Sequence, residues 1–317
     1  MIEGLAALIK REDDFLVAVH VQPDGDAIGA ALALGRLLRE LGKSYRLAVA
    51  DGGEIPPQYK WLPGIAEFTQ QVTPAAKVFV TLDVANESRL GRLAPALAEA
   101  AITVNIDHHP DNPGFADHNW VDSTISSTSE MIFYLWEEMG VELTYEPALA
   151  IYVGMLTDTG RWQYSNTTSR SLRIAAELVR LGVKPIEVFK NVYESYSVEW
   201  FKLLALGLDK AVFDQDIGLA YTLITQEDLA HTGASLAESE NLVDRLRSVI
   251  RINLAMVLKE TRKGEIKVSL RSREPIDVGA LARLFGGGGH RNASGFVSKE
   301  KPETIIESVK QWLTASS

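Results

Sequence analysis

The first half of the chain alternates short apolar runs with longer segments in which apolar residues recur at helical spacing. Residues 27–41 and 88–100 have this spacing, which predicts an amphipathic helix in each. The short runs are rich in β-branched and aromatic residues and predict buried strands, at residues 15–20, 45–50, 78–83 and 102–107. Alternating strands and helices are typical of βαβ units. We therefore predict an α/β fold whose mostly parallel sheet carries helices on both faces.

The pattern changes in the second half of the chain. More helices are expected first, after Ser127, after Tyr145, after Ser169 and in a connector over residues 184–208. Later runs predict strands at 217–225, 250–260, 265–272 and 293–298, with helices near 235–248, at 277–285 and from about Pro302. We therefore predict a first domain at 1–190, a helical connector at 191–212 and a smaller α/β substrate-binding domain at 213–317.

The composition is that of a soluble globular protein with room for two cores, since 46% of the 317 residues are hydrophobic and 23% are charged. No apolar run approaches the ~20 residues that a membrane-spanning helix requires. Residues 1–15 have neither a basic leader nor a small-residue cleavage site, so we expect a cytoplasmic protein without a membrane partner. The sequence contains no cysteine, so any metal must be held by histidines and carboxylates.

The charge is distributed unevenly along the chain. The net charge is −10, but Arg245 to Arg291 contains 11 Lys and Arg against 4 Asp and Glu, a local charge of +7 that leaves −17 for the rest. An acidic body argues against a protein that coats long nucleic acids by counterion release. One basic segment suits a small anionic ligand, although the same cations could form an ordinary solvated face.

Metal-type ligands lie at the ends of three predicted strands of the first half and at the end of one predicted helix. The strand ends carry His20, Asp24, Asp26, Asp83, Asp107, His108 and His109, and the helix end carries Asp158. Taken alone, each has an ordinary alternative, since Asp26 could cap the following helix and a lone histidine is usually structural. Active sites of parallel sheets gather beyond the carboxyl ends of the strands, where such a cluster of charges would repel itself without cations. The sequence therefore predicts a metal site at this edge.

Four motifs resemble those of the DHH phosphoesterase family. They are the His-x-x-Pro-Asp-x-Asp pattern of residues 20–26, the Asp-His-His signature of 107–109, the segment 157–170 and the glycine run that ends at His290. These motifs occur in the family's order and span nearly the whole chain. The resemblance is strongest to the oligoribonuclease (nanoRNase) and 3′-phosphoadenosine-5′-phosphate phosphatase branch. Asn86 departs from the pattern, because relatives often have an acidic residue there.

The resemblance implies two bound Mn²⁺ ions, with Mg²⁺ or Co²⁺ as substitutes, which suits an oxygen-rich site with some imidazole. One ion would be held by His20, Asp24 and Asp83. The other would be held by Asp26, Asp83, His108 and Asp158, so that Asp83 bridges the pair. The remaining members of the signature have other implied roles: His109 binds the substrate phosphate and Asp107 orients neighbouring groups.

The glycine run resembles the substrate-binding loop of a DHHA1 domain. Consecutive glycines can form a nest of N–H groups around an anion, and nearby cations can add charge-assisted bonds. The implied substrate-binding residues are Arg271, Gly287, Gly288, Gly289, His290 and Arg291. A flexible linker is the alternative, but structured apolar segments flank the run. Ser127–Ser129 could likewise bind a phosphate or cap the helix that follows, and the sequence does not decide between them.

The resemblance implies hydrolysis of short oligonucleotides, of about two to five nucleotides, and cleavage of phosphoadenosine phosphate to AMP. The acidic body agrees with short substrates, because it offers no continuous basic track for a long strand. In this interpretation the smaller domain binds the nucleotide end across a cleft. A phosphodiesterase for linear or cyclic signalling dinucleotides and a non-catalytic nucleotide-binding protein stay open as alternatives. The sequence is also compatible with a homodimer.

Overall fold

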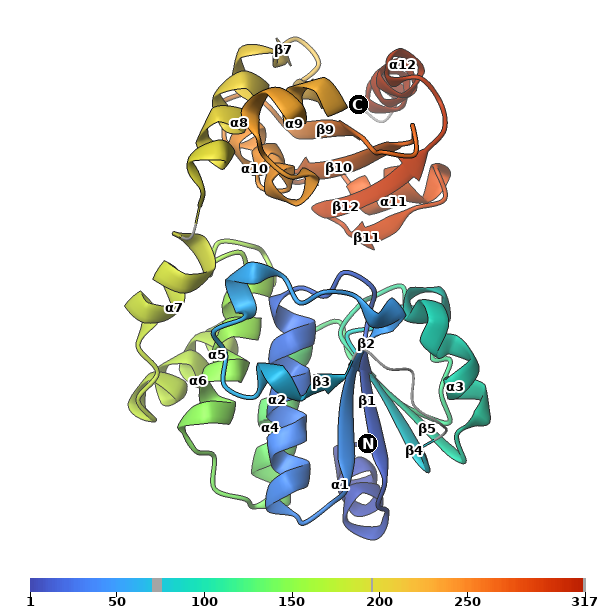
Figure 1. Cartoon of the computed structure of the whole chain (residues 1–317), viewed down its shortest axis with the longest axis vertical. Helices are drawn as coiled ribbons and strands as arrows, with labels where there is room; N and C mark the ends of the chain where they lie inside the picture. The colour runs from blue at the N-terminus through green and yellow to red at the C-terminus, as the bar shows by residue number, and fades with distance from the viewer. Residues whose placement is uncertain (70–75, 195, 316–317) are drawn as a thin grey trace. The chain divides into compact units, whose positions relative to one another are not determined.

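The computed structural model describes residues 1–69, 76–194 and 196–315, and the side chains of Asp51 and His290 lie outside this description. The chain divides into two compact units, Met1–Ser195 and Tyr196–Ser317, and each is described by itself (Figure 1). Within the described residues, no helix is both long and apolar enough to cross a membrane.

The first unit is built on a fully parallel sheet in the order β3-β2-β1-β4-β5-β6. Its strands are β1 (Phe15–Val19), β2 (Tyr45–Val49), β3 (Phe68–Thr69), β4 (Val78–Leu82), β5 (Ile102–Asp107) and β6 (His118–Val121). The chain moves outward from β1 to β3 and then returns to the other side of β1 with β4. The strand order therefore reverses between β1 and β4, and a crevice is expected at their carboxyl ends.

Helices cover both faces of this sheet. The larger layer contains α1 (Ile2–Arg11), α2 (Gly25–Glu40), α4 (Thr128–Met139), α5 (Tyr145–Asp158), α6 (Ser169–Arg180) and α7 (Pro185–Tyr193). The smaller layer contains the 3-10 segment η4 (Glu87–Leu93) and α3 (Ala94–Glu99). Short 3-10 turns follow β2, at η1 (Ala50–Gly52), η2 (Pro57–Tyr59) and η3 (Ile65–Glu67). Phe15 and Val17 of β1 enter the larger core, whereas Leu16 and Ala18 enter the smaller one, as strand alternation requires.

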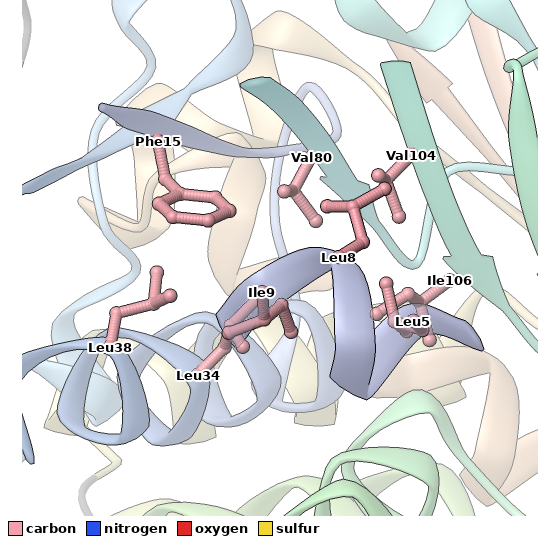
Figure 2. A pocket seen from close by; sticks show the side chains of 9 residues that line it. All are labelled: Leu5, Leu8, Ile9, Phe15, Leu34, Leu38, Val80, Val104 and Ile106. Atoms are coloured by element: carbon pink, nitrogen blue, oxygen red, sulfur yellow. The ribbon is translucent and has the colours of Figure 1, made fainter. Parts of the chain in front are cut away.

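A small cavity lies between α1 and the sheet (Figure 2). Its lining is entirely apolar and consists of Leu5, Leu8, Ile9, Phe15, Leu34, Leu38, Val80, Val104 and Ile106. A space without polar groups cannot hold an ordered water or orient a charged ligand. The cavity is therefore a packing feature of the core.

The second unit has a mixed sheet in the order β11-β12-β10-β9-β8-β7, in which only β8 and β9 pair in parallel. Its strands are β7 (Val212–Asp214), β8 (Leu219–Ile224), β9 (Leu254–Glu260), β10 (Ile266–Ser272), β11 (Gly288–His290) and β12 (Ala293–Ser298). One face packs against α8 (Val198–Asp209), α9 (Gln226–Thr232), η5 (Leu236–Ser239) and α10 (Leu242–Arg247). The other packs against α11 (Val278–Leu284) and α12 (Pro302–Ala315).

The α/β class and the parallel sheet with helices on both faces are confirmed, and several local predictions need correction. The predicted helix at 88–100 is a 3-10 segment followed by a short helix, because Gly91 interrupts it with φ of 47°. The predicted connector at 184–208 is two helices, α7 and α8. Helices α1 and α9 and the short strands β3, β6, β7 and β11 were not predicted. Each of these strands has only two to four residues at a sheet edge, which carry little periodic signal.

Candidate active site

The predicted ligands of the first unit lie at the carboxyl end of its sheet. His20 follows β1, Asp83 follows β4, and His108 follows β5. The three residues are at most 5% exposed, so they are buried at the carboxyl edge where the strand order reverses between β1 and β4. Asp158, the last residue of α5, adds a fourth side chain from the helical layer.

Two groups of donor atoms share Asp83. His20 Nε2 lies 3.5 Å from Asp83 Oδ2 and 4.0 Å from Asp24 Oδ1. His108 Nε2 lies 3.6 Å from Asp83 Oδ1, on the other carboxylate oxygen. His108 Nε2 also lies 3.5 Å from an Asp158 oxygen and 3.9 Å from an Asp26 oxygen. The structure therefore brings all six sequence-predicted ligands together, with one oxygen of Asp83 directed to each group.

The start of α2 positions two of these carboxylates. Asp24 is the N-cap of α2, where Oδ1 accepts hydrogen bonds from the backbone N–H groups of Asp26 and Ala27. The cap is therefore Asp24 and not Asp26, the alternative that the sequence left open. With the capping role taken, the Asp26 side chain is free to turn inward, and the residue is only 1% exposed.

The N-terminus of α4 holds the Asp26 carboxylate. The backbone N–H groups of Thr128 and Ser129 donate to its two oxygens over 2.6 and 2.8 Å. Ser127 caps the helix through the N–H of Glu130. The cap interpretation of Ser127–Ser129 is therefore correct and the phosphate interpretation is wrong, since the free N–H groups that a phosphate would need already bind a carboxylate.

Sequence reasoning missed several residues that shape this site. Asn166 donates from Nδ2 to an Asp158 carboxylate oxygen over 3.1 Å and to the Asp158 carbonyl over 3.2 Å. Thr128 Oγ1 donates to Asp83 Oδ1 over 3.2 Å. Gly154 passes so close to α4 that an added Cβ would lie 2.9 Å from Asp26 Oδ1. The motif around Asp158 contained Asn166, but only the packing of α2, α4 and α5 reveals the other two.

His109 is oriented by Asp107. Its Nδ1 lies 2.7 Å from Asp107 Oδ1 and 3.5 Å from Asp83 Oδ1. The second Asp107 oxygen accepts a 2.6 Å hydrogen bond from Asn112 Nδ2, so this fully buried carboxylate is fixed in place. A nitrogen that donates to Asp107 has no lone pair, so Nδ1 of His109 cannot bind a metal ion.

The buried carboxylates repel one another. Burial, with the charges of Asp83, Asp158 and Asp24, raises the pKa of Asp26 well above its usual value. Burial also raises the pKa of Asp158 to about 7, and the charge of His108 opposes this shift only in part. Bound cations would relieve both effects, so the donor set fits divalent metal ions.

The pKa shifts of Asp83 and His109 instead favour the charged form of each side chain. Burial would raise the pKa of Asp83, but its hydrogen bond to His20 and the charges of His109 and His108 lower it. Burial would lower the pKa of His109, but the hydrogen bond to Asp107 and the charge of Asp83 raise it to about 10. Asp83 is thus the carboxylate of the cluster most readily kept ionised, as the predicted bridging role requires.

Paired histidine–carboxylate groups at the carboxyl edge of a parallel sheet suit divalent metal ions, which can stabilise the charge that develops in phosphate-ester hydrolysis. Residues 14–155 match the DHH family, N-terminal domain, and residues 216–315 match the DHHA1 domain. The chain belongs to the DHH family with a DHHA1 domain, and it is a metal-dependent hydrolase of phosphate esters.

Two curated proteins and one crystal structure show which members of this family the chain is similar to. The bifunctional oligoribonuclease and PAP phosphatase NrnA of Thermus thermophilus is 35% identical over 96% of this chain and 91% of its own. The protein of the same name from Bacillus subtilis is 32% identical over 92% of this chain and 91% of its own. An exopolyphosphatase-related protein from Bacteroides fragilis, a crystal structure, has a TM-score of 0.92 at 29% identity, over 99% of this chain and 95% of that one.

Most of the predicted substrate-binding residues of the second unit lie on neighbouring strands, and Gly287 and Arg291 flank β11. Arg271 of β10 pairs with Ala293 of β12, and Ala293 pairs with His290 of β11. Two residues along each strand, on the same face, the cross-strand row contains Ser269, Gly295 and Gly288. Residues in register share a face of the sheet, so Arg271 belongs to a face with small neighbours. The side chain of His290 lies outside the described part.

The glycine run is partly structural. The N–H of Gly287 donates to the carbonyl of Ala282 at the end of α11, so only Gly288 and Gly289 remain candidates for the predicted nest. Gly289 has φ of 130°, and an added Cβ would lie 2.7 Å from the carbonyl oxygen of Ala293. Arg291 is exposed and pairs with Glu274 over 3.2 Å.

Proposed function

We propose that this protein hydrolyses short oligonucleotides, of about two to five nucleotides, to mononucleotides and also converts 3′-phosphoadenosine-5′-phosphate to AMP. The observation that carries the proposal is the placement of the two Asp83 oxygens, one toward each histidine-containing group. The names of the two similar NrnA proteins support the substrate class. The net charge of −10 argues against long strands as the preferred substrate.

Each residue of the site has a separate task in this proposal. His20, Asp24 and Asp83 hold one Mn²⁺, and Asp26, Asp83, His108 and Asp158 hold the second, with Mg²⁺ or Co²⁺ as substitutes. When bound, the ions supply Lewis-acid stabilisation of the phosphoryl oxygens and lower the pKa of water. His109, protonated and oriented by Asp107, donates from Nε2 to a phosphate oxygen of the substrate.

The second unit supplies substrate affinity. Arg271, Gly288, Gly289, His290 and Arg291 bind the terminal phosphate of the nucleotide, through guanidinium, amide and imidazole donors. Gly287 acts indirectly, by closing α11 next to this loop. The functional division follows the expected one, with a catalytic domain at 1–190, a connector at 191–212 and a substrate-binding domain at 213–317. A cytoplasmic location, the absence of a membrane partner and a homodimeric state belong to the same proposal.

A substrate panel with added Mn²⁺ tests the proposal. Product release is compared for dinucleotides, pentanucleotides, strands of about 20 nucleotides, phosphoadenosine phosphate and a cyclic dinucleotide. We expect the fastest turnover on the shortest linear substrates, and faster cleavage of the long strands would contradict the substrate class.

Two variants test the site itself. Asp83→Ala and Asp158→Ala should each reduce turnover by at least about 100-fold, because a missing ligand displaces a catalytic ion. Hydrolysis at the wild-type rate in both variants would show that the reaction does not use this metal site.

A further inference from the structure

Arg89 lies beside the metal site, yet none of the motifs includes it. It belongs to η4, the 3-10 segment that follows Asp83 along the chain. Its backbone carbonyl accepts a 3.0 Å hydrogen bond from the N–H of Val21, next to His20. Its side chain is exposed, and its Nη2 lies 2.8 Å from His20 Nδ1. The guanidinium therefore lies beside His20, and the backbone of Arg89 is tied to the segment that follows His20.

Nδ1 of His20 cannot both donate a hydrogen bond to one neighbour and accept one from another. The carbonyl oxygen of Val21 also lies 2.8 Å from this nitrogen. Nε2 faces Asp83 and Asp24, so a metal-binding His20 keeps its lone pair there and carries its hydrogen on Nδ1. That hydrogen is donated to Val21, and the ring then offers Arg89 no acceptor.

The donors of Arg89 are thus available to another partner. Among the side chains that the structure describes, no carboxylate forms an ion pair with Arg89, and its one side-chain hydrogen-bond contact is with His20. An Arg guanidinium presents five N–H donors in a planar fork that matches the oxygens of a phosphate group.

The charge of the site favours such a partner. The carboxylates of Asp24, Asp26, Asp83, Asp107 and Asp158 carry five negative charges, and two divalent ions with the protonated His109 supply five positive charges. The site is then neutral before the substrate phosphate adds its own negative charge. A further cation beside the site would offset that added charge without competing for the metal ligands.

We propose that Arg89 is a further substrate-binding residue, whose guanidinium binds a nonbridging oxygen of the scissile phosphate. This inference rests on the metal site of the proposed function. The competing role is purely local: Arg89 could hold the loop of His20 and influence metal binding alone. The two roles predict different losses when the side chain is removed.

The test compares Arg89→Ala and Arg89→Lys with Arg173→Ala, which removes an exposed arginine of α6 from the same unit. Calorimetry measures Mn²⁺ binding first, and then binding of inorganic phosphate to the Mn²⁺-loaded protein. We expect Arg89→Ala to weaken phosphate binding by about 10- to 100-fold, as for the loss of a charged hydrogen bond, with Mn²⁺ affinity within about twofold of wild type. Arg89→Lys should lose less phosphate affinity than Arg89→Ala, because lysine keeps the positive charge but lacks the planar set of N–H donors.

Two outcomes would overturn the proposal. One is phosphate affinity that is unchanged in Arg89→Ala, and the other is a loss of phosphate affinity that merely follows a loss of Mn²⁺ affinity. Thermal unfolding of each variant identifies a folding defect. If Arg89→Ala is misfolded, the phosphate and Mn²⁺ affinities of Arg89→Lys are compared with those of wild type instead. Because binding is measured without turnover, failure of the wild type to cleave the substrate panel would refute the proposed function while leaving the role of Arg89 testable.

Discussion

The N–H of Ser129 donates to Asp26 Oδ1 over 2.8 Å, although the two residues are 103 positions apart in sequence. Through this bond the N-terminus of α4 holds the carboxylate of Asp26, a residue in the first turn of α2. The helix dipole favours the ionised form of Asp26, which burial and neighbouring aspartates disfavour. A proposed metal ligand is thus kept in place by backbone groups that lie far away along the chain.

Gly154→Ala should disturb this arrangement. The added Cβ would lie 2.9 Å from Asp26 Oδ1 and closer still to Ser129 Oγ, so either α4 or the carboxylate must shift. We expect a loss of about 1–3 kcal/mol in the free energy of unfolding and weaker Mn²⁺ binding. Chemical denaturation and calorimetry measure the two effects. Gly4→Ala in α1, where no atom lies within 4 Å of the added Cβ, is the matched control and should be neutral or stabilising.

Asn166→Ala should weaken metal binding without touching a ligand. Asn166 orients Asp158 through two hydrogen bonds, and loss of an outer partner of a metal ligand typically costs about 10- to 100-fold in affinity. Mn²⁺ titration of the variant measures the change. Asn191→Ala, which removes an exposed amide bonded to the Glu187 carbonyl, should leave the affinity at the wild-type value. Equal affinities for the two variants would refute the positioning role.

The metal-free protein should lose stability as the pH rises from about 4 to about 7. The pKa of Asp158 is raised from 3.8 to about 7 in the folded state, so between these values the folded chain binds more protons than the unfolded chain. The free energy of unfolding then falls with increasing pH. His109, whose pKa is raised to about 10, adds a decrease in the same direction above about pH 6.5.

Thermal melts in a chelator between pH 5 and pH 7.5 measure this slope. Asp158→Asn should make the slope shallower, because the titrating group is gone. Added Mn²⁺ should also reduce it, because metal ions compete with protons for the carboxylates. A melting temperature that rises over this range in the chelator would contradict the assignment.

Asp244→Asn should weaken substrate binding from within the second unit. Asp244 Oδ1 lies 3.5 Å from Nε of Arg271 and 3.6 Å from Nε of Arg247, so it restrains the proposed phosphate-binding guanidinium. We expect KM to rise by about 3- to 10-fold with kcat nearly unchanged, the pattern of lost uniform binding. Steady-state kinetics on a dinucleotide measures both constants. Asp209→Asn, an exposed position at the end of α8, is the control.

The sequence by itself determined the class of fold and predicted which side chains gather at the carboxyl edge of the sheet. Four apolar runs became central strands, and His20, Asp83 and His108 lie at strand ends because parallel strands place their carboxyl termini on one edge. These features are local, because strand periodicity and motif spacing depend only on residues close together in the sequence.

Only the tertiary structure decided how these ligands are held. The residues that contact these side chains come from other segments of the chain: Thr128, Asn166, Gly154 and Arg89. No local sequence pattern distinguishes them from an ordinary cap, loop, helix or surface residue. The same reason explains the wrong phosphate interpretation of Ser127–Ser129. A helix N-terminus binds whichever anion the packing brings to it, and here that anion is the side chain of Asp26.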